Sequence, residues 1–162
     1  MKGFQIKIDG DWAHFKKPET NNNPLSHDLI PKTALIGMIG AVLGIEREKM
    51  KSFFPQLSED LLYGVELLKP IKKASCGFTS HTAINPTAIK SPKAFEMLRD
   101  VSYKVCVGLY GERSQSIFYE FQKAILEGYA VYDPYLGIAN CPAELTFISQ
   151  GEFTMMGNGD FK

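Results

Sequence analysis

Apolar and polar residues alternate along four short stretches of the chain, which is the pattern of a strand with one buried face and one wet face. The stretches are residues 4–8, 63–68, 101–109 and 144–147. The third gives the clearest alternation, with Val101, Tyr103, Val105, Val107 and Leu109 on one side. We therefore expect four core strands in this order along the chain.

Two longer stretches have apolar residues at helical spacing. Leu35, Met38, Ile39 and Val42 follow Pro31, whose fixed φ suits the start of a helix. The second helix is expected after Ser114, a reasonable N-cap, and before Gly128. Its buried face is predicted to consist of Ile117, Phe118, Phe121, Ala124 and Ile125. A short charged helix over residues 46–54 is expected to stop at Pro55.

Polar residues dominate two connecting stretches. Residues 16–31 read as a loop, and residues 72–93 are compatible with either a hairpin arm or a flexible loop. The order of elements is β-α-β, an insertion, then β-α-β. This order predicts an α+β fold, ferredoxin-like and RRM-related, with an antiparallel sheet, helices on one face and a protruding thumb or loop insertion. We expect one palm domain over residues 1–162, with the insertion at about residues 70–100.

Small residues form a stripe on the first predicted helix, at Gly37, Ala41 and Gly44, with Gly40 beside it. Each glycine inside a helix costs about 1 kcal/mol relative to alanine, so some contact should offset the cost. Close approach of a ligand or of another backbone at Gly37 and Gly40 would do so. Tight packing against the sheet is the structural alternative.

Composition narrows the class of protein. The 162 residues are 44% hydrophobic and 22% charged with a formal net charge of +0, so any nucleic-acid site must be a local patch. The three cysteines, at 76, 106 and 141, have neither the even number of a disulfide framework nor the C-x-x-C spacing of a zinc site. The N-terminus does not resemble a signal peptide, and we expect a cytoplasmic protein without a membrane contact.

Motifs for nucleotide hydrolysis, dinucleotide binding and serine nucleophiles do not occur in the sequence, and we expect neither a metal nor a cofactor. Lysines instead gather at the two polar stretches and at the start of the first helix, where free amides attract phosphate. Trp12, Phe15 and Phe78 are near them in sequence and are able to stack on unpaired bases. The candidate RNA-binding residues are Lys16, Lys17, Asn22, Lys32, Thr33, Lys72, Lys73, His81, Lys90 and Lys93.

The three histidines stand far apart in sequence. His14 ends the first strand between Ala13 and Phe15, where a hydrogen-bonded structural role is expected. His27 and His81 lie in the polar stretches and are weak candidates for the general base of a metal-free ribonuclease.

Several of these segments resemble the CRISPR-associated Cas-five family. The resemblance rests on residues 10–18 (GDWAHFKKP), residues 31–45 (PKTALIGMIGAVLGI), residues 101–105 and residues 135–143 (YLGIANCPA). It implies an RRM-related palm with a thumb, which caps one end of the type I complex called Cascade and holds the 5′ handle of the CRISPR RNA. It also implies contacts with a backbone subunit of the Cas-seven kind and with the large subunit.

The chain departs from the family at three points. Lys32 stands where arginine is common, which leaves a point charge in place of a bidentate fork. The chain ends at Lys162, so the family's C-terminal part is expected to be absent or reduced. No Lys-His dipeptide like that of the family's RNA-cleaving branch occurs. Separately from these three points, the aromatic signature of RRM domains is missing, so phosphate and loop contacts are favoured over base stacking on the sheet.

The sequence therefore predicts a non-catalytic RNA-binding scaffold subunit that functions in antiviral defence. Two alternatives stay open. One is a metal-independent endoribonuclease that processes precursor CRISPR RNA, and the other is a protein–protein adaptor of ferredoxin-like fold.

Overall fold

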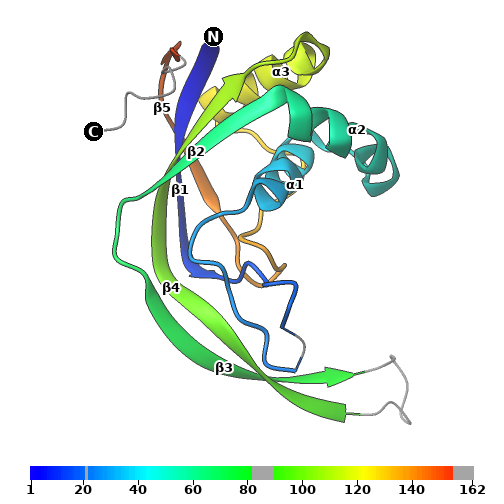
Figure 1. Ribbon diagram of the computed structural model, residues 1–162, viewed down its shortest axis with the longest axis vertical. Coiled ribbons are helices and arrows are strands. Elements are labelled where there is room, and N and C mark those ends of the chain that lie inside the picture. Colours follow the sequence, from blue (N-terminus) through cyan, green and yellow to red (C-terminus); the bar gives the residue numbers. More distant parts are fainter. Residues whose placement is uncertain (21, 82–89, 155–162) are drawn as a thin grey trace.

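The computed structural model describes residues 1–20, 22–81 and 90–154 of the chain. Helices and strands alternate much as the sequence pattern predicts (Figure 1). The elements are β1 (Lys2–Ala13), α1 (Lys32–Leu43), α2 (Arg47–Asp60), β2 (Leu61–Leu67), β3 (Lys72–His81), β4 (Lys90–Leu109), a 3-10 turn η1 (Glu112–Ser114), α3 (Gln115–Leu126) and β5 (Glu144–Glu152).

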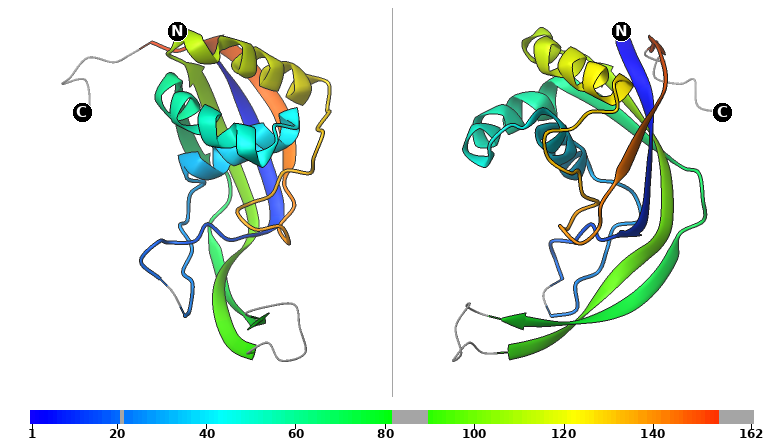
Figure 2. Two further views of the ribbon diagram at one scale, coloured as in Figure 1. Left: turned by 90° about the vertical axis from the view of Figure 1, so that its right-hand side faces the viewer. Right: turned by 180° about the vertical axis from the view of Figure 1, so that it is seen from behind.

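The sheet has the strand order β2-β4-β1-β5, and every neighbouring pair is antiparallel. Strand β4 lies between β1 and β2, which is the split β-α-β arrangement. Helices α1, α2 and α3 all lie on the concave side of the curled sheet (Figure 2). The predicted α+β fold of ferredoxin-like type is thus confirmed.

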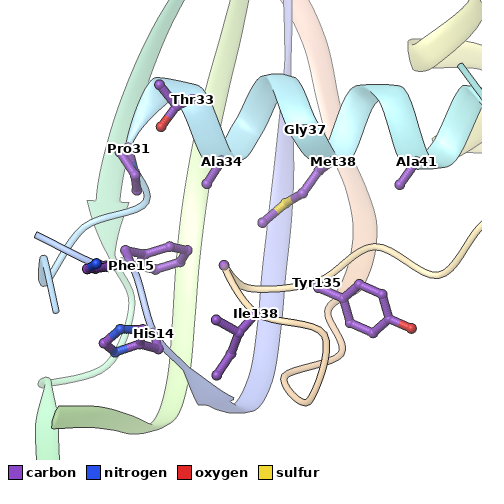
Figure 3. A pocket seen from close by; sticks show the side chains of 12 residues that line it. His14, Phe15, Pro31, Thr33, Ala34, Gly37, Met38, Ala41, Tyr135 and Ile138 are labelled. Carbon is purple, nitrogen blue, oxygen red and sulfur yellow. The ribbon is translucent and has the colours of Figure 1, made fainter. Parts of the chain in front are cut away.

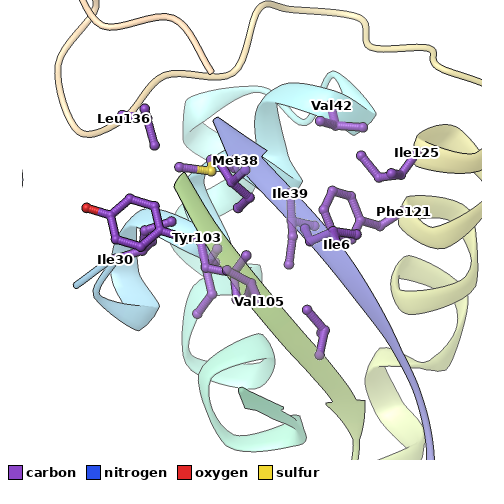
Figure 4. Packing of buried hydrophobic residues seen from close by; sticks show 14 of the residues in the cluster. Ile6, Ile30, Met38, Ile39, Val42, Tyr103, Val105, Phe121, Ile125 and Leu136 are labelled. Carbon is purple, nitrogen blue, oxygen red and sulfur yellow. The ribbon is translucent and has the colours of Figure 1, made fainter. Parts of the chain in front are cut away.

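The core fills the space between this face of the sheet and the helices. Ile6 of β1 pairs with Val105 of β4, and both side chains are fully buried. Phe4 packs on Phe118 and Phe121 of α3, with ring centroids 5.1 and 5.9 Å apart. Figure 4 shows members of the core, among them Ile6, Val105 and Phe121. The apolar residues predicted for α1, Leu35, Met38, Ile39 and Val42, are all buried. Alternation in the strands and helical spacing in α1 and α3 therefore meet in one core.

The second polar stretch forms a hairpin arm that extends from the sheet. Strand β3 pairs with the first half of β4, from Lys72 opposite Arg99 to His81 opposite Lys90. Strand β4 is 20 residues long and runs without interruption from the arm into the sheet. Between the two halves Asp100 adopts φ +51°, a left-handed conformation that aspartate tolerates better than most residues. The arm is thus anchored by a strand of the core.

One predicted helix boundary is wrong, and one predicted side-chain cap is absent. Helix α2 does not stop at Pro55 but continues to Asp60. Pro55 has no backbone N–H, so the carbonyl of Lys51 loses its partner in the helix. Both residues are exposed, and water can replace the lost hydrogen bond. Ser114 does occupy the position before α3, yet its hydroxyl makes no cap and donates to Asp60 Oδ2 at 2.9 Å.

The Asp60 carboxylate joins the end of α2 to the start of α3. It is 3% exposed and accepts hydrogen bonds from Arg113 at 2.5 Å and from Ser114. Its backbone carbonyl accepts from the amides of Tyr110 and Gly111. Chiefly because of the bond from Arg113, the pKa of Asp60 lies below its usual value of 3.8.

We expect Asp60→Ala to lower the free energy of unfolding by about 1–3 kcal/mol at pH 7, because it leaves the buried Ser114 hydroxyl without its acceptor and removes one of the two carboxylate partners of Arg113. The depressed pKa contributes stability that is present above pH 3.8 and is lost as the pH falls through the lower folded pKa. Asp60→Asn should therefore flatten the acid side of the stability profile. Urea unfolding between pH 2 and pH 7 measures both effects. Glu59→Ala, which removes an exposed partner of the same Arg113, is the control and should change stability by under about 1 kcal/mol.

Candidate nucleic-acid interface

A groove of about 420 Å³ opens between α1 and the loop that precedes β5. One wall is the exposed side of α1, the other is the loop around Tyr135 and Ile138, and one end is closed by the chain that follows β1 (Figure 3). Its lining residues are His14, Phe15, Lys16, Pro31, Thr33, Ala34, Gly37, Met38, Ala41, Tyr135, Gly137 and Ile138. The first two motifs of the family resemblance and part of the last one therefore meet at one place.

The two glycines singled out on α1 have different surroundings. Gly37 faces the groove and is exposed, and a Cβ built on it meets nothing within 4 Å. Gly40 is buried, and a Cβ there comes within 3.0 Å of Met50 Sδ on α2. Gly40 therefore lets α1 pack closely on α2, whereas Gly37 keeps the wall of the groove open.

The N-terminus of α1 opens at one end of this groove. Its N-cap residue is Pro31, which makes no side-chain cap, and its first turn contains no acidic residue. The partial positive charge of the helix end is therefore left without a carboxylate neighbour on the helix itself. Thr33 lines the groove here, but the Lys32 Nζ crosses to α2 and donates to the carbonyl of Ser58.

The first polar loop is held by hydrogen bonds. Lys16 and Ser26 form an isolated antiparallel β-bridge. The Lys17 amide donates to the carbonyl of Leu25 at 2.8 Å, and the Ser26 hydroxyl accepts a hydrogen bond from the Phe15 amide. The loop then docks on the arm, where the Glu96 amide donates to the carbonyl of Pro24 at 2.9 Å. Lys16 and Asn22 are exposed and Lys17 is half-buried. The loop thus places Lys16 beside the groove.

Carboxylates neutralise the lysines at the base of the arm. Lys73 is 2.8 Å from Asp28 and 3.2 Å from Glu96, and its pKa is raised first by the hydrogen bond to Asp28. Lys72 lies 3.6 Å from Asp100, which is also paired with Lys69. These candidates are part of the ion pairs that fix the arm.

Lysines further along the arm have a different environment. Lys93 pairs across the hairpin with Phe78, and both border a hollow that Asn23 of the first polar loop also lines. Phe78 is 38% exposed and touches Phe95 edge-to-face, with ring centroids 5.1 Å apart. For Lys16, Lys17, Lys90 and Lys93, no ion pair forms with any residue that the structure describes. The arm therefore presents an exposed aromatic ring beside lysine charge.

The histidines are placed separately. His14 is buried, its Nδ1 lies 2.9 Å from the carbonyl of Glu96, and its ring packs against Phe95, so the hydrogen bond expected for it is present. Its Nε2 is buried without a hydrogen-bond partner among the described residues. His27 is exposed on the loop. The side chain of His81 lies outside the described residues.

The face of the sheet without helices is polar. Lys7 and Asp9 of β1 pair at 2.8 Å, and Lys104 of β4 pairs with Glu66 of β2. These lysines are thus neutralised within the sheet. Among residues 1–20, 22–81 and 90–154, no group of three His, Cys, Asp or Glu side chains could hold a metal ion. None of the helices in the same part of the chain is long and apolar enough to cross a membrane.

Sequence reasoning missed the second wall of the groove. Residues 135–138 were identified only as part of a resemblance and received no role. Gly137 has φ +93°, and a Cβ there would collide with the carbonyl of His14, so glycine is required where the loop crosses the end of β1. The available signal was Gly137, two residues after Tyr135. The residue that it contacts, His14, is more than a hundred residues away in the sequence, so the sequence did not show the contact.

The fold and the groove define a class of protein: a split β-α-β domain with a hairpin arm and a lysine-flanked groove on the concave side. The family described as CRISPR-associated protein (Cas_Cas5) matches residues 3–150, and the chain belongs to this family. Comparison with curated proteins finds no significant match.

Solved structures share the fold at low sequence identity. One, described as "CRISPR RNA-guided surveillance complex", is 17% identical with a TM-score of 0.62 and covers 85% of this chain and 58% of its own. Another, described as "Crystal Structure of CRISPR-associated Protein", is 15% identical with a TM-score of 0.55 and covers 92% of this chain and 69% of its own. The chain therefore spans about three fifths to two thirds of the length of these proteins.

The different surroundings of the two glycines lead to a stability prediction. Gly37→Leu should leave the free energy of unfolding unchanged or raise it by up to about 1 kcal/mol, because the side chain enters open space and leucine favours helix. Gly40→Leu should lower it by about 1–3 kcal/mol through overpacking against Met50. Chemical denaturation of the two variants measures the difference, and a loss of stability in Gly37→Leu would contradict the open groove.

Proposed function

We propose that this chain is a non-catalytic RNA-binding scaffold subunit of a type I CRISPR effector complex, Cascade, and that it holds the 5′ handle of the CRISPR RNA. Family membership supports the CRISPR context. The observation that carries the RNA role is the open groove at the uncapped start of α1, with Lys16 at its rim and Gly37 in its wall. Free helix amides and a lysine together bind phosphate oxygens.

The proposed RNA path runs from this groove to the hairpin arm. Phosphates bind at Thr33 and Lys16, and a sugar or base lies against Gly37, where the missing side chain permits close approach. The first polar loop connects the groove to the hollow at Phe78 and Lys93. An exposed phenylalanine beside a lysine suits an unstacked base and its phosphate, so the RNA bound here is single-stranded.

The assignment of partners rests on the family. We propose that the chain is one palm domain whose β3–β4 arm is the thumb. On this assignment it caps the backbone subunit of the Cas-seven kind and contacts the large subunit. The sheet face without helices is a poor RNA surface, because its lysines are paired with carboxylates.

The non-catalytic role is proposed from the requirements of metal-free cleavage, which needs a base at the 2′-hydroxyl and a cation at the phosphate. His14 is buried, its Nδ1 contacts the carbonyl of Glu96 and its ring packs on Phe95, which supports a structural role for it. The endoribonuclease alternative would need His27 or His81 as the base, and the test below includes both.

The lysines are expected to contribute unequally to RNA binding. Lys16→Ala and Lys93→Ala should each reduce the salt slope of single-stranded RNA binding by about 0.7, the change for one lost phosphate contact. Lys73→Ala should change the slope much less, because Asp28 and Glu96 already neutralise this ammonium. Titrations of repeat RNA at several salt concentrations give the slopes. If Lys16→Ala and Lys93→Ala both keep the salt slope of the wild type, the RNA binds elsewhere.

The protein is expected to retain its cognate repeat RNA without cutting it. Incubation in EDTA, followed by filter binding and denaturing electrophoresis, measures retention and integrity separately. Gly37→Leu, which fills the groove, should lower retention at least tenfold. Cleavage at one phosphodiester that His27→Ala or His81→Ala abolishes would make the chain an endoribonuclease. Absence of retention in the folded wild-type chain would favour the adaptor alternative.

A further inference from the structure

An exposed apolar surface lies on the segment that follows α3. Leu126, Tyr129, Val131 and Tyr132, together called the tyrosine surface, are 55%, 59%, 46% and 57% exposed. They occur within seven successive residues, so this exposure is concentrated rather than scattered. A concentration of exposed apolar side chains on a folded domain marks an interaction site, and tyrosine is enriched where proteins bind one another.

The backbone under this surface is fixed to α1. The amides of Val131 and Tyr132 donate to the carbonyls of Val42 and Ala41, both at 3.0 Å, and so satisfy acceptors in the last turn of the helix. The Tyr129 amide donates to the carbonyl of Ala124 at 2.9 Å. The tyrosines are therefore presented on an ordered backbone, which reduces the entropy lost when they bind a partner.

Charge identifies the kind of partner. The sequence contains no lysine or arginine between Lys123 and Lys162. Asp133, next to the tyrosine surface, is exposed and forms no ion pair with a described residue, whereas Glu127 lies 3.8 Å from Lys123. Carboxylates repel phosphates, so this side of the molecule is unfavourable for RNA. They attract arginine, whose guanidinium also stacks on tyrosine rings.

We propose that the tyrosine surface docks an arginine-bearing protein surface of a neighbouring subunit. Tyr129 and Tyr132 supply the apolar contact, and Asp133 pairs with an arginine. The inference rests on the proposed function in that the neighbour is a protein subunit of the same CRISPR complex. It adds that protein docks at the C-terminal end of α1, while RNA is bound in the groove.

The test uses the complex reconstituted from the full chain, the protein subunits encoded with it and CRISPR RNA. Tyr132→Ala combined with Asp133→Lys should reduce the occupancy of one neighbouring subunit at least tenfold in native mass spectrometry. Retention of repeat RNA by the isolated variant should equal that of the wild type. The matched control is Tyr110→Ala combined with Glu112→Lys, which removes an exposed tyrosine and reverses an exposed acidic charge at the start of η1.

A photo-crosslinking amino acid placed at position 132 identifies what covers the surface. A crosslink to an arginine-containing segment of a neighbouring subunit, lost on Asp133→Lys, supports the proposal. A crosslink to RNA, or unchanged subunit occupancy in the double variant, overturns it while leaving the RNA-holding role intact. A complex that assembles fully without this chain overturns the proposed function and this inference together.

Discussion

The antiparallel pairing of β4 is the interaction on which the rest of the structure depends. Its second half pairs with β1 and β2 in the middle of the sheet, and its first half pairs with β3 in the arm. The arm therefore needs no core of its own, because it continues a strand whose other half is buried. Asp100, with φ +51° and ion pairs to Lys69 and Lys72, lies at the junction of the two halves. The hollow at Phe78 is placed relative to the groove through this one strand.

The formal net charge of the chain is zero, but paired lysines, unpaired lysines and acidic residues lie in different parts of the structure. Lysines of the sheet and of the arm's base are paired with carboxylates and stabilise the fold. Lysines at the groove rim and further along the arm have no such partner among the residues placed by the structure. The segment after Lys123 contains acidic residues and no lysine or arginine before Lys162. A neutral protein thereby presents one side suited to phosphate and another suited to a basic protein surface.

Local patterns predicted the fold well, because alternation and helical spacing record which side chains enter the core. The buried faces of α1 and β4 were identified correctly from such spacing. One helix end and one helix cap were predicted less well, since Pro55 is tolerated where water solvates the freed carbonyl, and the Ser114 hydroxyl donates to Asp60, which is 54 residues away. Neither outcome is encoded in the neighbouring sequence. Exposure to water decided the first outcome, and a tertiary contact decided the second.

The candidate site was predictable as a set of segments but not as a surface. Lysine content alone gave Lys16, Lys73 and Lys93 equal weight, and only the carboxylates of Asp28 and Glu96 distinguish Lys73 from the others. Gly37 and Gly40 likewise looked equivalent, because the sequence does not show what lies opposite each residue of the helix. Their difference arises from what lies opposite each of them, open space or Met50.

Helix α1 connects the two proposed binding sides. Its start and its Gly37 side line the groove, while the carbonyls of Ala41 and Val42 in its last turn hold the segment that carries Tyr132. Gly44, with φ +68°, ends the helix, and a Cβ there would meet Val131 at 2.7 Å. The glycines of this helix therefore have three separate uses: an open wall at Gly37, close packing at Gly40 and a chain reversal under the tyrosine surface at Gly44. A helix so rich in glycine is poor in intrinsic propensity. Its stability comes instead from Leu35, Ile36 and Ile39, which are buried in the core, so the binding sides depend on the same packing that holds the sheet.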